Sequence, residues 1–240
     1  MSNLEAKKIA PATGTTVTLG AAGDAVEVAS SATLKTNTIK DAGGNTLFTS
    51  DGSGTITSIN SAFKPGLTFI SSQTASGSAS ISFTSGIDST YNEYIFFFHT
   101  INPATDNVQF QFNGSTDGGS NYNVTKTTTA FRASHSEADS SALGYLTAQD
   151  LAQETLYQWL GDGWGNGADE CGAGELHLFN AASTTYIKNF VARAPFYHSA
   201  NSSFINYVGG YCNTTSAVNA IQFKMSSGNF DGTIAMYGTG

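Results

Sequence analysis

The feature that most constrains this chain is a series of short segments in which apolar and polar residues alternate. Val108, Phe110 and Phe112 are separated by single glutamines, and Leu176 and Leu178 flank a histidine. A period of two sends successive side chains to opposite faces, so it predicts half-buried β-strands and not helices. Twelve such segments are expected as strands: 67–72, 79–84, 94–100, 107–113, 125–132, 142–147, 154–160, 174–180, 186–197, 203–211, 218–226 and 232–238.

The composition supports an all-β chain. Gly, Ser, Thr and Asn make up 102 of the 240 residues, and these residue types suit strands and turns. Charged residues make up 12%, whereas a typical soluble domain carries about 25%. The twelve segments, with turn residues between them, predict an antiparallel, jelly-roll-like β-sandwich packed from two sheets. Only residues 147–156 offer an alternative helix, and it is short.

The chain divides into two unlike segments near Lys64-Pro65-Gly66. Residues 1–66 contain two aromatic residues and equal numbers of acidic and basic residues, five of each. Residues 67–240 contain both tryptophans, all ten tyrosines and thirteen acidic against five basic residues. We therefore predict an extended, fibrous β segment over 1–66 and a β-sandwich head over 67–240.

The first segment repeats short β-type stretches with one or two aliphatic residues in each. Their spacing is eight or nine residues within each of two sets, Val17, Val26 and Leu34, and then Ile39, Leu47 and Ile56. So few apolar side chains cannot offset roughly 1–2 kcal/mol of backbone entropy per ordered residue. We expect these six residues to form the core of a homotrimeric shaft, because stacked copies can bury them together. The alternative is a flexible tether.

Charge, targeting signals and cysteines exclude several classes of protein. The net charge of -8 disfavours binding to nucleic acid, because phosphate backbones would be repelled. Residues 1–10 lack the apolar core of a secretory signal, and no apolar run is long enough to cross a membrane. Cys171 and Cys212 are too few for a disulfide scaffold; buried free thiols are expected, and a single bridge is the alternative.

Catalytic motifs are not found in the sequence. It contains no Gly-x-Ser-x-Gly, Walker or His-Glu-x-x-His motif, and no pair among its four histidines has metal-ligand spacing. Residues 163–168 match Gly-x-Gly-x-x-Ala by letters, but no buried parallel strand precedes them. The chain is therefore expected not to be an enzyme and to need no cofactor or catalytic metal.

One glycine-rich loop, residues 161–175, concentrates acidic residues around a tryptophan. Trp164 with Asp162, Asn166 and Asp169 is a candidate glycan-binding set, because an aromatic ring stacks on a sugar while polar groups bind its hydroxyls. Clustered carboxylates also suit Ca²⁺, although the spacing is not that of an EF-hand. The calcium candidates are Asp162, Asp169, Glu170 and Glu175. The third interpretation is a solvated loop with Trp164 folded back as a local cap.

Several strings resemble small tail-fibre-like virion proteins of tailed bacteriophages, especially phages of aquatic bacteria such as cyanophages. The N-terminal string is TVTLGAAGDAVEVASSATLKTNTIKDAGGNTLFTSDGSGTITSIN. The head strings are GIDSTYNEYIFFFHTINPATDN, ADECGAGELHLFNAASTTYIKNF and FKMSSGNFDGTIAMYG. The resemblance implies a homotrimeric virion component with a fibrous N-terminal part and a β-sandwich head.

These observations favour a non-enzymatic tail fibre or similar appendage in the virion. Its N-terminal segment would attach to other virion proteins, in the tail or the capsid, and its head would contact surface polysaccharide on the host. One alternative is a capsid decoration or head-fibre protein, in which the same N-terminal segment holds capsomers together. A polysaccharide-degrading tailspike is the second alternative, although about 175 residues of sandwich leave little room for the long β-helix that such spikes use.

Overall fold

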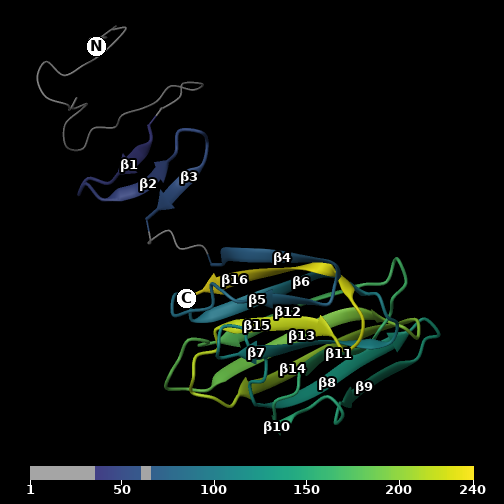
Figure 1. Ribbon diagram of the computed structural model, residues 1–240. Helices are drawn as coiled ribbons and strands as arrows, with labels where there is room; N and C mark the ends of the chain where they lie inside the picture. Colours follow the sequence, from purple (N-terminus) through teal and green to yellow (C-terminus); the bar gives the residue numbers. More distant parts are fainter. Residues whose placement is uncertain (1–35, 61–65) are drawn as a thin grey trace, which may run out of the picture. The chain divides into compact units, whose positions relative to one another are not determined.

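The computed structural model describes residues 36–60 and 66–240 (Figure 1). They belong to two compact units, Met1–Lys64 and Pro65–Gly240. Every regular element in the described residues is a β-strand, and all strand pairs are antiparallel, which confirms the predicted all-β class. The predicted shaft residues Val17, Val26 and Leu34 lie outside the described residues.

The N-terminal unit contains a three-stranded sheet of β1 (Thr38–Lys40), β2 (Thr46–Ser50) and β3 (Ile56–Ile59), in that order. Aspartate side chains stabilise the turns between these strands by hydrogen bonds to backbone N–H groups. Asp41 accepts a hydrogen bond from the Asn45 N–H at 2.8 Å, and Asp51 accepts one from the Ser53 N–H at 2.7 Å. Such side-chain contacts are the reason that aspartate favours turns. The β-type stretches around Ile39, Leu47 and Ile56 are thus strands in the structure.

None of the described residues in this small sheet is buried within the chain. Ile39 lies opposite Phe48, and Phe48 lies opposite Ile59, so the three apolar side chains share one face. Phe48 is 37% exposed and Ile59 is 54% exposed. Leu47 precedes Phe48 and therefore points to the other face, because side chains alternate along a strand. The predicted shaft core is thus divided between two faces.

The head contains thirteen strands arranged in two layers (Figure 1). The first layer has the order β4-β16-β6-β12-β13-β14-β8-β9, with β10 also beside β8, and the second has the order β5-β15-β7-β11. The strands are β4 (Thr68–Ser78), β5 (Ser80–Phe83), β6 (Glu93–Pro103), β7 (Val108–Ser115), β8 (Lys126–Ser136), β9 (Ser141–Tyr145), β10 (Ala152–Glu154), β11 (Gln158–Trp164), β12 (Gly172–Phe179), β13 (Lys188–His198), β14 (Ser202–Cys212), β15 (Ala220–Met225) and β16 (Phe230–Thr239).

Aromatic side chains from both layers fill the space between them. Phe98 of β6 packs against Phe110 of β7 and Phe223 of β15, with ring centroids 5.4 and 5.2 Å apart. Phe112 of β7 meets Phe190 of β13 at 5.1 Å. Edge-to-face contacts of this kind add about 0.5–1.5 kcal/mol each beyond the burial of their area. The predicted β-sandwich, with its core of aromatic strands, is confirmed.

The two layers are not separate sheets, contrary to our expectation. Trp164 at the end of β11 pairs with His198 at the end of β13, which joins the layers into one continuous thirteen-stranded sheet. The link exists because β13 is long: it continues beyond Phe196, the last residue that pairs with β12.

Two other predictions for the head differ from the structure. The single strand predicted at 154–160 is two strands, β10 and β11, and the alternative helix at 147–156 is not formed.

Two lysines lie fully buried inside the head, opposite a buried cysteine. Cys212 of β14 lies between Lys188 of β13 and Lys126 of β8 in the strand register. The Lys126 Nζ donates to Asn113 Oδ1 at 2.5 Å and to the Val124 carbonyl at 2.8 Å, and burial lowers the pKa of Lys126 to about 8. Burial raises the pKa of the Cys212 thiol to about 11. Both lysine ammonium groups are hydrogen-bonded inside the head, but burial removes their solvation by water and so lowers their pKa values.

These buried groups make the stability of the head depend on pH. Between pH 8 and 9 the unfolded chain keeps the proton that folded Lys126 loses, so Lys126 by itself is expected to raise the free energy of unfolding by about 1 kcal/mol. Lys188, whose pKa is also lowered by burial, contributes in the same direction. The unfolded Cys212 thiol, with an ordinary pKa near 9, begins to ionise in the same range while the folded thiol stays protonated, so it offsets part of this rise and opposes it more strongly above pH 9. Urea titrations at pH 7.5, 8.5 and 9.5 measure this profile.

The Lys126→Met variant is the control, because it removes the titrating amine but keeps an unbranched apolar chain. Its stability is expected to change less between pH 8 and 9 than that of the parent protein. An unchanged rise in this variant would show that Lys126 is not its source.

Candidate functional site

The predicted glycine-rich loop is shorter in the structure than the sequence indicated. Asp162 and Trp164 belong to β11, and Glu175 belongs to β12, so the connection itself spans only residues 165–171. Within it, the Glu170 carboxylate accepts a hydrogen bond from the Gly167 N–H at 2.8 Å. The Asn102 amide donates to the carbonyls of Gly167 and Glu170. The connection is therefore tied to itself and to the end of β6.

Trp164 is fully buried, so its ring cannot stack on a sugar, and the predicted glycan contact at this residue is wrong. The indole stacks on Phe196 with ring centroids 4.6 Å apart and an interplanar angle of 4°. Phe110 packs against it at 5.4 Å. The inward orientation agrees with the alternative interpretation, in which Trp164 folds back onto the protein.

The burial of Trp164 also explains two of the glycines around it. A Cβ atom on Gly161 would lie 2.5 Å from the indole Nε1, and one on Gly172 would lie 2.3 Å from the indole Cζ3. Both distances are far below van der Waals contact, so any larger residue would displace the ring. These glycines are thus required by packing, and their number is no sign of a flexible ligand-binding loop.

The other predicted glycan residues do not converge on one point. Asp162 is half-buried and accepts a hydrogen bond from the Gln109 amide at 2.6 Å. Asn166 is exposed and its amide approaches the Ala104 carbonyl at 3.4 Å, while Asp169 is exposed on the same connection. Without the ring of Trp164 these polar groups have no platform to share.

The carboxylates proposed for calcium are also separated by their partners. Glu175 binds the Arg193 Nε at 2.7 Å and approaches the His177 Nε2 at 3.4 Å, on a different strand from Asp162. In residues 36–60 and 66–240, no group of three or more His, Cys, Asp or Glu side chains is placed to hold a metal ion. The structure does not bring Asp162, Asp169, Glu170 and Glu175 together.

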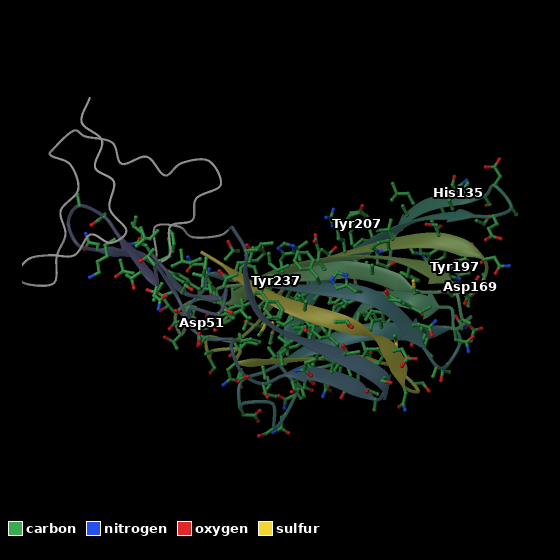
Figure 2. The ribbon with its side chains drawn as sticks, turned by 90° about the horizontal axis from the view of Figure 1, so that it is seen from above. Asp51, His135, Asp169, Tyr197, Tyr207 and Tyr237 are labelled. Carbon is green, nitrogen blue, oxygen red and sulfur yellow. The ribbon has the colours of Figure 1, made fainter. Side chains whose placement is uncertain are left out.

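The end of the head that carries residues 165–171 has several further acidic loops. Figure 2 shows His135, Tyr197 and Asp169 at this end, away from Tyr237 near the C-terminus. The Tyr197 hydroxyl contacts Glu137 and Asn201, each at 3.2 Å. Desolvation, together with the charges of Glu137, Glu170 and Asp169, raises the pKa of Tyr197. This end of the head therefore carries a negative potential.

A shallow cavity of about 570 Å³ opens beside these acidic loops. His135, Cys171, Pro195, Tyr197 and Ser203 are among its lining residues. Cys171 is exposed there, whereas Cys212 is buried, and both thiols are free. The expectation that both thiols are buried is therefore wrong for Cys171, because it lies on the loop before β12 and not inside a strand.

A second concave region lies on the outer face of the smaller layer and contains the other tryptophan. This cleft of about 390 Å³ includes Trp159 and Tyr157 with Gln111, Asp150 and Glu154. Sequence reasoning missed Trp159, because Tyr157 and Trp159 alternate with the polar Gln158, a pattern that favours an inward ring. In the structure Gln158 and Leu160 are buried and Trp159 between them faces outward. Two bulges between Trp159 and Trp164 then place Trp164 opposite Val108 in the core.

The chain matches no protein-family model, no curated protein and no solved structure. No helix in the described part of the chain is long and apolar enough to cross a membrane. We therefore infer the function from the geometry of the two units.

Proposed function

We propose that the protein is a non-enzymatic structural component of a bacteriophage virion, a homotrimeric tail fibre or similar appendage whose head contacts the host surface. The observation that carries this proposal is the contrast between the two units. The head has its own aromatic core, whereas the described strands of the N-terminal unit bury nothing within one chain. A sheet with an apolar face and no covering layer gains stability when other copies of the chain cover it.

The strand order of the head supports the proposal by analogy. Eight strands can be numbered in chain order: β4, β5, β6, β7, β11, β12, β15 and β16. One layer then has the order first-eighth-third-sixth, and the other has the order second-seventh-fourth-fifth. We infer a jelly roll from this order. Jelly rolls occur in viral capsid proteins and lectins. A fold alone does not define a function, so this support is secondary.

The position of the loops fits a head that presents one end outward. The first strand begins at Thr68 beside the end of the last strand, Thr239, so the chain enters the head at the end where it finishes. Residues 137–140, 165–171 and 199–201 lie at the opposite end of the strands. In an attached protein these loops would be free to meet a surface.

Oligomeric state tests the proposal. The full-length protein is expected to be a trimer by light scattering coupled to size exclusion. The double variant Phe48→Ser, Ile59→Ser removes two apolar side chains from the exposed face of the N-terminal sheet and is expected to shift the distribution towards monomer, because that face loses its apolar contact area.

The thermal unfolding of the head should be unchanged in the double variant, which separates loss of assembly from misfolding. A monodisperse monomer of the parent protein would contradict the trimer. Electron microscopy of intact particles labelled with an antibody against the head would then show whether the protein lies on the tail or on the capsid.

A further inference from the structure

The cleft around Trp159 combines features that suit a saccharide. Its floor is the outer face of β7 and β11, where Trp159 lies directly opposite Gln111 in the strand register. The segment 148–156 forms its side. Its volume of about 390 Å³ lies within the range of about 300–1,000 Å³ that is usual for ligand pockets.

The aromatic platform of the cleft consists of Trp159 and Tyr157, and the Tyr157 ring is held in place before any ligand arrives. The Tyr157 hydroxyl donates to Gln222 Oε1 at 2.5 Å, and the Gln222 amide donates to Ser82 Oγ at 2.9 Å. The Lys224 Nζ lies 4.3 Å from the centroid of the Tyr157 ring. Trp159 is partly exposed on the neighbouring outward position. Fixed rings cost little conformational entropy when they bind, which favours affinity.

Polar side chains surround the platform. Asp150 is half-buried and its Oδ2 accepts a hydrogen bond from the Tyr145 hydroxyl at 2.7 Å, which fixes the direction of the carboxylate. Glu154 is exposed, and Gln111 is 7% exposed beside Trp159. Carboxylates and amides bind pairs of neighbouring hydroxyl groups, while the apolar face of a sugar ring packs on an aromatic ring.

We propose that this cleft binds an uncharged saccharide, with Trp159 as the stacking platform and Asp150, Glu154 and Gln111 as hydrogen-bonding partners of its hydroxyl groups. The lining of the cleft favours uncharged over acidic sugars, because it holds two carboxylates, and Lys224, opposite Gln111 on β15, is engaged with the Tyr157 ring. The head as a whole carries thirteen acidic against five basic residues, two of which are buried lysines. A uronic acid would meet like charges here. The saccharide role rests on the proposed function, in which the head contacts host polysaccharide; the cleft would meet it on the side of the head.

Binding to defined oligosaccharides tests this inference with the full-length protein. The probes are a printed panel of neutral oligomers of glucose, galactose, mannose and N-acetylglucosamine, with oligogalacturonate as the acidic comparison. At least one neutral oligomer is expected to bind and oligogalacturonate is not. Trp159→Ala should weaken the binding by about tenfold or more, and Trp159→Phe should retain part of it.

Tyr186→Ala is the matched control, since Tyr186 is an aromatic residue 71% exposed outside the cleft. Its affinity should equal that of the parent protein. Tryptophan fluorescence gives a second readout: the oligomer that binds should change the emission of the parent protein but not that of Trp159→Phe, because Trp164 is buried.

Three results would overturn the inference: no neutral oligomer binds, Trp159→Ala binds as tightly as the parent protein, or oligogalacturonate is preferred. The oligomeric state of the same samples separates this inference from the proposed function. A trimer that binds no oligomer overturns the cleft alone, and a monomer that binds through Trp159 overturns the trimeric assembly alone.

Discussion

The Trp164→Ala variant is expected to lose about 3–5 kcal/mol of the free energy of unfolding, which is the usual cost of truncating a buried aromatic residue. Trp164 is fully buried between Phe110 and Phe196, at the point where β11 pairs with β13. Its removal leaves a cavity and also weakens the only described strand pairing that joins the two layers. Urea titration followed by far-UV circular dichroism measures the loss.

Trp159→Ala is the matched control, because it is the same substitution five residues away on the outer face. It is expected to cost less than about 1 kcal/mol, since its side chain is only partly buried. Trp164→Phe should retain most of the stability, because it keeps a ring beside Phe196 and removes an indole N–H that is buried without a hydrogen-bond partner. Equal losses for Trp164→Ala and Trp159→Ala would contradict the positions that the structure gives them.

Asn113→Ala is expected to destabilise the head by a similar amount, about 3–5 kcal/mol. Asn113 is fully buried and its Oδ1 accepts the hydrogen bond of the buried Lys126 ammonium at 2.5 Å. Its amide donates to the carbonyls of Tyr122 and Thr155, at 2.8 and 2.9 Å. Truncation leaves the buried Lys126 ammonium without this acceptor and the Tyr122 and Thr155 carbonyls without this donor.

The destabilisation caused by Asn113→Ala should decrease as the pH rises above 8, because Lys126 then becomes neutral and the loss of its hydrogen-bond acceptor costs less free energy. Chemical unfolding at pH 7 and pH 9.5 measures this difference. The control is Asn121→Ala at an exposed position, whose amide contacts Asp117 at 2.7 Å, and it should cost less than about 0.5 kcal/mol. A cost for Asn113→Ala that does not depend on pH would show that Lys126 plays no part in it.

The strands of the head could be predicted because alternation is a local property. The segment at 186–197 corresponds to β13, and the segment at 203–211 to β14, each within two residues at both ends. The ends of the strands were less predictable. β4 continues to Ser78 through serines and a glycine, because hydrogen bonds from β16 support residues that have little strand propensity of their own.

The candidate site could not be predicted in the same way. The sequence placed Trp164 on a glycine-rich loop, where a ring is normally exposed, and the structure placed it in the core. Gly161 and Gly172 are glycines because the indole of Trp164 approaches their backbone. Both lie within eight residues of Trp164, but the ring turns towards them where it stacks on Phe196 of β13, which is distant in the sequence. The Trp159 cleft depends on Tyr157, Gln111 and the segment 148–156 meeting on one face, which is also a tertiary property.

By itself, the sequence determined the secondary structure class, the turns and the inward or outward parity of most strand residues, because these follow from the backbone geometry of neighbouring residues. Only the tertiary structure decided how the layers are joined, which tryptophan is exposed and which carboxylates share a partner. Strand pairing brings together residues far apart in the chain, such as His198 and Trp164, and the packing of the two layers brings together others, such as Phe98 and Phe223; no local pattern encodes either choice.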